Sequence, residues 1–216
     1  MNALNTSFDG LPFMGQAVAT VEIANPLRGV ARGTLIATEN GIRPVEELQA
    51  GDCVQTFDNG WQPIVEVRRI TATPDDQMAD WPLTIPAGTL GNTRDITVMP
   101  DQGLMVCSEN ARDVMGDPFA VVPVQVLEGL CGISRAAPAQ QTDLFILVFA
   151  TEEVVFSDGG QLLHFGCEQM GGRPARYDVK SLDQAQDMLT DLDLAELVLE
   201  DERNEVLSRG RLARVA

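Results

Sequence analysis

Imidazole and thiol side chains, which serve as general bases, nucleophiles and metal ligands, are few in this 216-residue chain. The chain contains one histidine, His164, and four cysteines: Cys53, Cys107, Cys131 and Cys167. A single histidine cannot build a multi-histidine metal site, and no two cysteines form a C-x-x-C pair. We therefore predict no metal site and no cofactor. We expect His164 to be a part-buried strand residue and the cysteines to be small buried apolar side chains.

Two pairs of adjacent carboxylates could be considered for acid–base chemistry, namely Asp75 with Asp76 and Glu152 with Glu153. Adjacent side chains on a strand point to opposite faces of the sheet, so neither pair can converge on one substrate. We interpret most of these groups as solvated surface charge, which argues against a carboxylate-based hydrolase.

An acidic segment near the C-terminus resembles a calcium-binding loop only in part. Asp191, Asp193 and Glu202 have suitable side chains. Ala195 takes the fifth loop position, and Glu196 takes the position that requires glycine. The segment does not predict a calcium site.

The charge balance narrows the choice of partners. Lys and Arg number 15 and Asp and Glu 32, so the formal net charge is −17. A surface this acidic repels phosphate backbones and anionic membranes, so we predict neither nucleic-acid nor membrane binding. Attraction between opposite charges would favour a basic protein partner. No basic residue precedes Arg28, and no apolar run approaches the roughly 20 residues of a membrane helix. We therefore predict a cytoplasmic protein, with export lacking a cleaved leader left open.

The pattern of apolar residues predicts a mainly β chain. Short β-rich runs alternate with turns containing Gly and Pro from about residue 33 to 165, which is typical of a compact all-β fold. Strands are expected at 34–38, 53–57, 61–70, 83–85, 95–99, 103–107, 119–126, 144–149 and 153–156, with short helical turns at 44–48 and 124–130. Asn40-Gly41 and the segment 58–60 predict hairpin turns.

The two ends of the chain differ from this β segment. Residues 1–28 are expected to be a leader arm with one strand at 16–23. Residues 29–170 form the predicted β domain, and 171–216 a small α+β extension. Ser181 followed by Gln184 is a capping-box signal for a helix of about ten residues. A hairpin is expected between residues 196 and 212.

Three segments together resemble the Hint (hedgehog/intein) domain family, in its bacterial branch. Residues 33–56 (GTLIATENGIRPVEELQAGDCVQT) match the opening pattern of that family. Residues 87–106 (AGTLGNTRDITVMPDQGLMV) resemble its second motif, and 143–159 (DLFILVFATEEVVFSDG) its third strand pair. The resemblance implies the compact all-β Hint fold over about 130 residues. It also implies self-cleavage, since a family member attacks the peptide bond at the start of its own domain.

The residues that this reaction needs are missing at the matching positions. The family's first residue is a cysteine or serine nucleophile, and here the position is Gly29. A histidine of the second motif is replaced by Gln102, which cannot titrate, and a hydroxyl residue three positions earlier is Met99. A histidine position of the third motif falls near Ile146 and Glu152. We therefore expect these positions to be degenerate.

The sequence favours a catalytically silent Hint-like domain kept as a binding or structural module, and leans against enzymatic activity. The alternative is an active autoprocessing domain that uses a non-standard nucleophile. Asn25-Pro26, Asn40-Gly41 and Asp117-Pro118 are chemically weak bonds. We interpret all three as ordinary turns.

Overall fold

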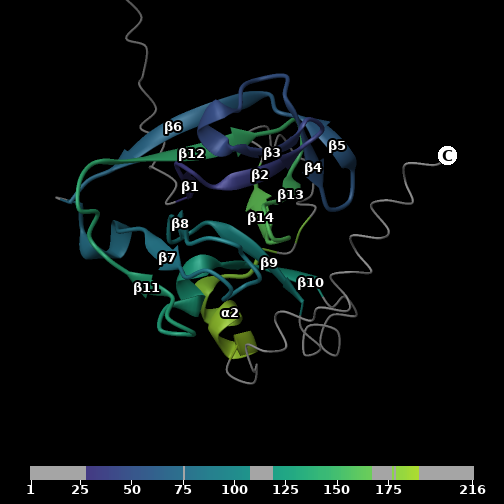
Figure 1. Cartoon of the computed structure of the whole chain (residues 1–216). Coiled ribbons are helices and arrows are strands. Elements are labelled where there is room, and N and C mark those ends of the chain that lie inside the picture. The colour runs from purple at the N-terminus through teal and green to yellow at the C-terminus, as the bar shows by residue number, and fades with distance from the viewer. Residues whose placement is uncertain (1–27, 75, 108–118, 167–176, 178, 190–216) are drawn as a thin grey trace, which may run out of the picture.

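The computed structural model describes residues 28–74, 76–107, 119–166, 177 and 179–189. These residues form a mainly β fold of two antiparallel sheets with few and short helices (Figure 1). The expected fold class is confirmed. The expected leader strand at 16–23 and the expected hairpin at 196–212 lie outside the described residues.

The first sheet has six strands, and its centre positions the start of the domain. Its strands, in spatial order, are β11 (Ser134–Arg135), β7 (Leu83–Ile85), β8 (Ile96–Val98), β1 (Val30–Ala31), β12 (Thr142–Val148) and β6 (Glu66–Ala72). The long strands β12 and β6 pair along seven residues and run side by side in Figure 1. The two-residue strand β1 is held between β8 and β12.

The second sheet has eight strands and carries the family-like hairpins. Its order is β10 (Phe119–Pro123), β9 (Gly103–Cys107), β14 (Leu162–Phe165), β13 (Glu153–Phe156), β4 (Cys53–Thr56), β2 (Leu35–Thr38) and β3 (Gly41–Pro44), with β5 (Gly60–Pro63) also paired to β4. The turn between β2 and β3 is formed by residues 39–40, because Thr38 pairs with Gly41. Gly41 opens β3 with a φ of 100°, which favours glycine.

Four short helical elements complete the described fold: the 3-10 helices η1 (Val45–Glu47), η2 (Met78–Asp80) and η3 (Val124–Leu127), and the α-helix α2 (Leu182–Leu189). The predicted capping box is present, because Ser181 N donates to Gln184 Oε1 (3.0 Å) and Gln184 N donates to Ser181 Oγ (3.3 Å). Ala185 buries this helix against the main core. None of the helices in the described part of the chain is long and apolar enough to cross a membrane.

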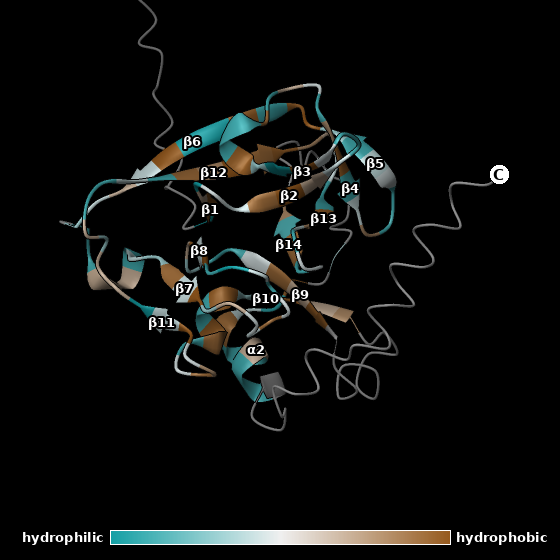
Figure 2. Ribbon diagram, viewed as in Figure 1, coloured by the Kyte–Doolittle hydropathy of each residue, from teal (hydrophilic) through white to brown (hydrophobic). Residues whose placement is uncertain are grey.

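One large core lies between the sheets and draws on almost every strand. Its fully buried members include Val30, Ile36, Leu83, Leu147 and Leu163. Figure 2 shows hydrophobic residues along β9 and β12, whereas α2 presents mostly hydrophilic residues. In β2 and β4, where buried and half-buried residues alternate, the apolar positions fix which face of the strand turns inward, whereas β13 is buried along its whole length.

Two expected elements are divided differently in the structure. The run 61–70 forms two strands, β5 and β6. The break lies at Ile64, whose backbone bonds to the turn before β4 instead of continuing the strand. Gly51 N donates to Ile64 O (2.8 Å), and Ile64 N donates to Asp52 O (2.9 Å). The run 119–126 stops being a strand at Pro123, where the chain turns into η3. Apolar residues continue on both sides of each break, so periodicity could not show it.

The expectation of buried cysteines is wrong for both cysteines whose side chains are described. Cys53 is half-buried, and Cys131 is exposed. Cys131 has a φ of 44° in a turn between Gly129 and Gly132. The turn lies on the surface, so a small apolar side chain there gains nothing from burial. The side chains of Cys107 and Cys167 lie outside the described part.

Candidate functional site

The structure brings three of the four predicted degenerate positions together at the start of the domain. Gly29 N donates to Gln102 Oε1 (3.0 Å), and Met99 N donates to Gly29 O (2.9 Å). Gln102 N donates in turn to Met99 O (3.0 Å). The peptide group that a Hint domain would break is therefore the one whose N–H points at Gln102.

Gln102 is a fully paired side chain rather than an acid or base. It is 1% exposed. Its Nε2 donates to His164 O (2.8 Å) and Gly103 O (3.1 Å), while its Oε1 accepts from Gly29. An amide at this place can orient the Arg28–Gly29 peptide but cannot transfer a proton to its nitrogen.

Gly29 has a backbone conformation and surroundings that disfavour any side chain. It is buried, with a φ of 132°, a region that L-residues rarely adopt. A Cβ at Gly29 would lie 3.2 Å from Phe145 O and 3.3 Å from Ile146 Cγ1. A cysteine or serine nucleophile would thus need both the backbone and β12 to shift.

Met99 supplies an apolar contact at the position where the resemblance implies a hydroxyl. Its side chain is 5% exposed and packs in a small cluster with Ala31, Ala72 and Leu144. A polar group would have to be buried there without an evident partner, which costs free energy. The surroundings of Met99 therefore suit packing and not acid–base chemistry.

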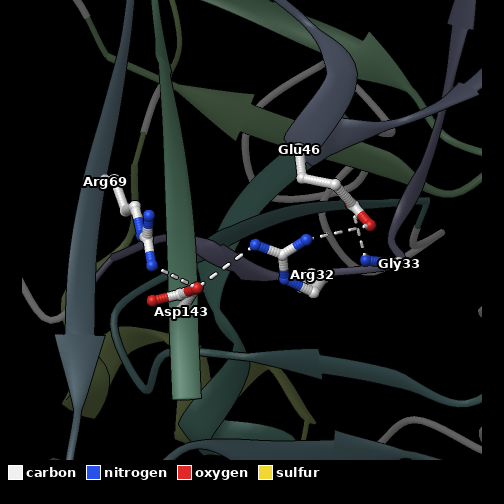
Figure 3. Close-up of polar contacts among 5 residues, drawn as sticks. All are labelled: Arg32, Gly33, Glu46, Arg69 and Asp143. Carbon is white, nitrogen blue, oxygen red and sulfur yellow. Dashed lines mark hydrogen bonds and ion pairs between the residues drawn. The ribbon is translucent and has the colours of Figure 1, made fainter. Parts of the chain in front are cut away.

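A polar network holds β1 immediately after Gly29 (Figure 3). Arg32 Nη2 binds Asp143 Oδ2 (3.3 Å), and Arg69 Nη2 binds the same oxygen (2.6 Å). Gly33 N donates to Glu46 Oε2 (2.8 Å), and Arg32 lies 3.9 Å from the other oxygen of Glu46. The hydrogen bond from Arg69, with a further one from Arg32, lowers the pKa of Asp143 despite some desolvation. The network anchors β1 to β12 and to the turn at η1.

The fourth predicted position, Glu152, belongs to a different polar cluster. It is 8% exposed, and its Oε2 accepts from Tyr177 N (3.4 Å). The Tyr177 hydroxyl donates to Asp58 Oδ2 (2.7 Å), and its ring meets the His164 ring edge-on at 5.6 Å between centroids. This cluster ties the segment before α2 to the second sheet.

His164 lies on β14 opposite Gly103 and is more buried than the sequence indicates, at 3% exposed. Burial lowers its pKa to about 4, with a further lowering from Arg28 and an opposing effect of Glu152. Its Nε2 has no hydrogen-bond partner among the described residues. Only its backbone carbonyl reaches the Gln102 side chain. A neutral imidazole of such low basicity is a poor general base at neutral pH.

The prediction of solvated charge is wrong for Glu152 and Glu153. Glu153 is 1% exposed; both of its oxygens accept from Asn59 Nδ2 (2.9 Å each), and Oε1 also accepts from Thr151 Oγ1 (2.8 Å). The two carboxylates have separate partners and do not form a catalytic pair. No sequence signal linked Glu153 to Asn59, because the contact joins distant hairpins. Asp75 lies outside the described residues.

Metal-binding clusters of three or more His, Cys, Asp or Glu residues are absent from the part of the chain that the structure describes. Among the described carboxylates, Asp52 forms an ion pair with Arg43 (3.2 Å between Oδ2 and Nη1).

Comparison with known proteins gives the family. The Hint domain family matches residues 29–162, which is more than half of the chain. None of the curated proteins matches. A bacterial intein-like domain from Clostridium thermocellum is similar, with 14% identity over 63% of this chain and 98% of that chain and a TM-score of 0.43. The gp41-1 intein is similar as well, with 11% identity over 64% of this chain and 98% of that chain and a TM-score of 0.42. A splice-inactive variant of the AceL NrdHF class 3 split intein has 13% identity over 65% of this chain and 99% of that chain, with a TM-score of 0.43. Because the family match covers more than half of its residues, this chain belongs to the Hint domain family.

Proposed function

We propose that this protein is a catalytically silent Hint domain that serves as a binding or structural module. The observation that carries the proposal is the pairing of Gly29 with Gln102. The residue at the family's nucleophile position has no side chain, and the group facing its N–H is an amide. Neither the attack on the preceding carbonyl nor the protonation of the amide nitrogen has a suitable group there.

The alternative of a non-standard nucleophile finds one candidate near the junction. Ser181 lines the same cavity as Arg28. Its Oγ accepts from Gln184 N and thereby caps α2, and among the described residues no hydrogen bond joins it to His164 or Asp101, which line the same cavity. A capping hydroxyl without a base is a weak nucleophile, so this observation favours the silent domain.

Intact mass spectrometry of the purified full-length chain tests the proposal. The protein is held for a day at neutral pH with and without dithiothreitol, which would intercept a thioester. A single species at full-length mass in both samples supports the silent domain. A fragment that begins at or near Gly29, growing with thiol, would show that the domain cleaves itself.

The acidic composition supports a basic protein as the partner of this module. With a net charge of −17, long-range attraction would speed the approach of a positively charged surface. Binding of such a partner should weaken as salt screens the charges. Titration of a basic candidate at low and high ionic strength checks this, and salt-insensitive binding would contradict it.

A further inference from the structure

The sequence contains two Asn-Gly dipeptides, and both lie in the turns of neighbouring hairpins. Asn40-Gly41 joins β2 to β3, and Asn59-Gly60 joins β4 to β5. Strands β2 and β4 pair with each other in the second sheet (Figure 1). Gly41 and Gly60 both have a positive φ, of 100° and 65°. The molecule therefore presents the same dipeptide twice, in comparable places.

A threonine hydroxyl closes each of the two turns in the same way. Thr38 Oγ1 accepts from Asn40 N (3.2 Å) and donates to the carbonyl of the following glycine (2.6 Å). Thr56 Oγ1 makes the same two bonds to Asn59 and its glycine, at 3.3 and 2.9 Å. The backbone around the two dipeptides is therefore held by equivalent bonds, although the first turn is one residue shorter.

The side chains of the two asparagines are held differently. Asn40 is exposed, and its amide has no hydrogen-bond partner among the described residues. Asn59 is half-buried, and its Nδ2 donates to both carboxylate oxygens of Glu153 (2.9 Å each). Glu153 is 1% exposed and also accepts from Thr151 Oγ1 (2.8 Å), which holds the carboxylate in place. The amide of Asn40 is thus free to rotate, whereas that of Asn59 is fixed.

An asparagine amide that precedes glycine can react with the main chain. The glycine nitrogen gives up its proton and attacks the asparagine Cγ. The N–Cγ bond forms, the Cγ–Nδ2 bond breaks, and ammonia leaves with that proton. Water then opens the resulting succinimide at either carbonyl, which gives aspartate or isoaspartate. The sum consumes one water, releases one ammonia and leaves the main chain continuous. Glycine favours the attack because it has no Cβ to hinder the approach.

We propose that Asn40 is a site of spontaneous deamidation and that Glu153 protects Asn59 from the same reaction. To bring its Cγ to the nitrogen of Gly60, Asn59 must rotate and give up both bonds to the carboxylate. Hydrogen bonds to charged groups are strong enough to slow this step at least about tenfold.

The products change the turn between β2 and β3. Aspartate and isoaspartate each add a negative charge at residue 40, and isoaspartate also adds a methylene to the main chain of a two-residue turn. Strand β3 is the last strand at its end of the second sheet, so the change falls on the edge of that sheet. The inference goes beyond the proposed function and does not depend on it, because Asn40 and Gly41 do not belong to the Arg28–Gly29 junction.

Peptide mapping of the folded full-length protein in heavy-oxygen water measures both sites at once. The protein is held for several weeks at slightly alkaline pH and is then digested after glutamate in ordinary water. Residues 40 and 59 fall on separate peptides because Glu46 and Glu47 lie between them. Heavy oxygen marks only the deamidation that occurs during the incubation, and electron-transfer fragmentation distinguishes isoaspartate from aspartate. We expect Asn40 to react at least about tenfold faster than Asn59.

The same protein unfolded in guanidinium chloride is the control. Both dipeptides then lie in a flexible chain, so their rates should become similar. A folded protein in which the two asparagines react equally fast, or in which Asn40 does not react, would overturn the proposal. This comparison uses the wild type alone and does not depend on any variant.

Two variants test the role of each side chain, with the fold of both checked by circular dichroism. In Glu153→Ala, Asn59 loses its acceptor and should approach the rate of Asn40. Asn40→Gln should remove the labelled product at residue 40, because glutamine forms the larger ring slowly, and should leave the rate of Asn59 unchanged. An Asn59 that stays as slow in folded Glu153→Ala as in the wild type would show that Glu153 does not protect it.

Discussion

The Gln102 side chain accepts a hydrogen bond from the backbone N–H of Gly29 at 3.0 Å, across 73 residues of sequence. The same side chain donates to Gly103 O and His164 O, so one amide joins the residue before β1 to β9 and β14. In a Hint domain the group at this place would have to protonate the leaving nitrogen. Here it pairs with three backbone groups, Gly29 N–H, Gly103 C=O and His164 C=O, which is a structural task.

Replacing Gln102 should therefore destabilise the fold. Gln102→Ala removes the side-chain acceptor of the buried Gly29 N–H and the bonds to Gly103 O and His164 O, which we expect to cost roughly 2–4 kcal/mol of unfolding free energy. Urea unfolding followed by circular dichroism measures the loss. Gln49→Ala, which removes an exposed side chain, is the control and should change little. Equal stability of the two variants would show that the Gln102 bonds contribute nothing.

Gly29 should resist substitution more strongly than another glycine with positive φ. Gly29→Ala combines a φ of 132° with a Cβ 3.2 Å from Phe145 O, and we expect a loss of about 2–3 kcal/mol. Gly33 has a φ of 87° and nothing within 4 Å of an added Cβ, so Gly33→Ala should cost about 1 kcal/mol. Comparing their urea midpoints checks the difference. A smaller loss at Gly29 would mean that a side chain, and hence a nucleophile, fits there.

The buried His164 predicts how stability depends on pH. Its pKa is about 4 in the folded protein and near 6.5 when unfolded. Above pH 6.5 both states are neutral and the stability is fully present. As pH falls from 6.5 to 4, the unfolded state takes up a proton that the folded state does not, so about 3 kcal/mol is lost.

Two measurements check the behaviour of His164. NMR titration of its ring should show no protonation until pH approaches 4. The unfolding free energy of the wild type should fall more between pH 7 and 4.5 than that of His164→Gln, which has no titrating imidazole. A ring that titrates near pH 6.5 would contradict the burial that the structure shows.

Two hydrogen-bonded carboxylates, Glu153 and Asp143, should differ in their contributions to stability. Glu153→Gln disrupts a 1% exposed group with three hydrogen bonds and should cost about 1–3 kcal/mol. Asp143→Asn breaks contacts with Arg32 and Arg69, whose side chains are 57% and 61% exposed, so water and salt screen them. We expect a smaller loss for Asp143, and one that shrinks in high salt. Urea unfolding of both variants at two salt concentrations measures the two losses of stability. A larger loss for Asp143→Asn than for Glu153→Gln would contradict this prediction.

Local signals in the sequence predicted the parts of the fold that depend on neighbouring residues. The capping box of Ser181 and Gln184 forms as expected. The resemblance to the Hint family singled out Gly29, Met99 and Gln102, and the structure brings these three residues into contact.

Features that depend on distant partners were not predictable. The two-residue strand β1 has no periodicity of its own and exists because β8 and β12 flank it. Glu153 looked solvated because Asn59, its partner, lies 94 residues away. The segment before α2 lines the same cavity as Arg28 because Lys180 N donates to Val121 O on β10, a contact that no local pattern reveals.

Hydroxylamine treatment of the folded full-length protein at neutral pH, followed by intact mass, tests the central claim most directly. Hydroxylamine cleaves any ester or thioester in the backbone, whichever residue formed it, so it also detects a non-standard nucleophile. Cleavage at Asn40-Gly41 or Asn59-Gly60 would have its own mass and is excluded from the comparison. We predict that the Arg28–Gly29 bond stays intact. Fragments that end at Arg28 and begin at Gly29 would show that this Hint domain still forms the acyl intermediate.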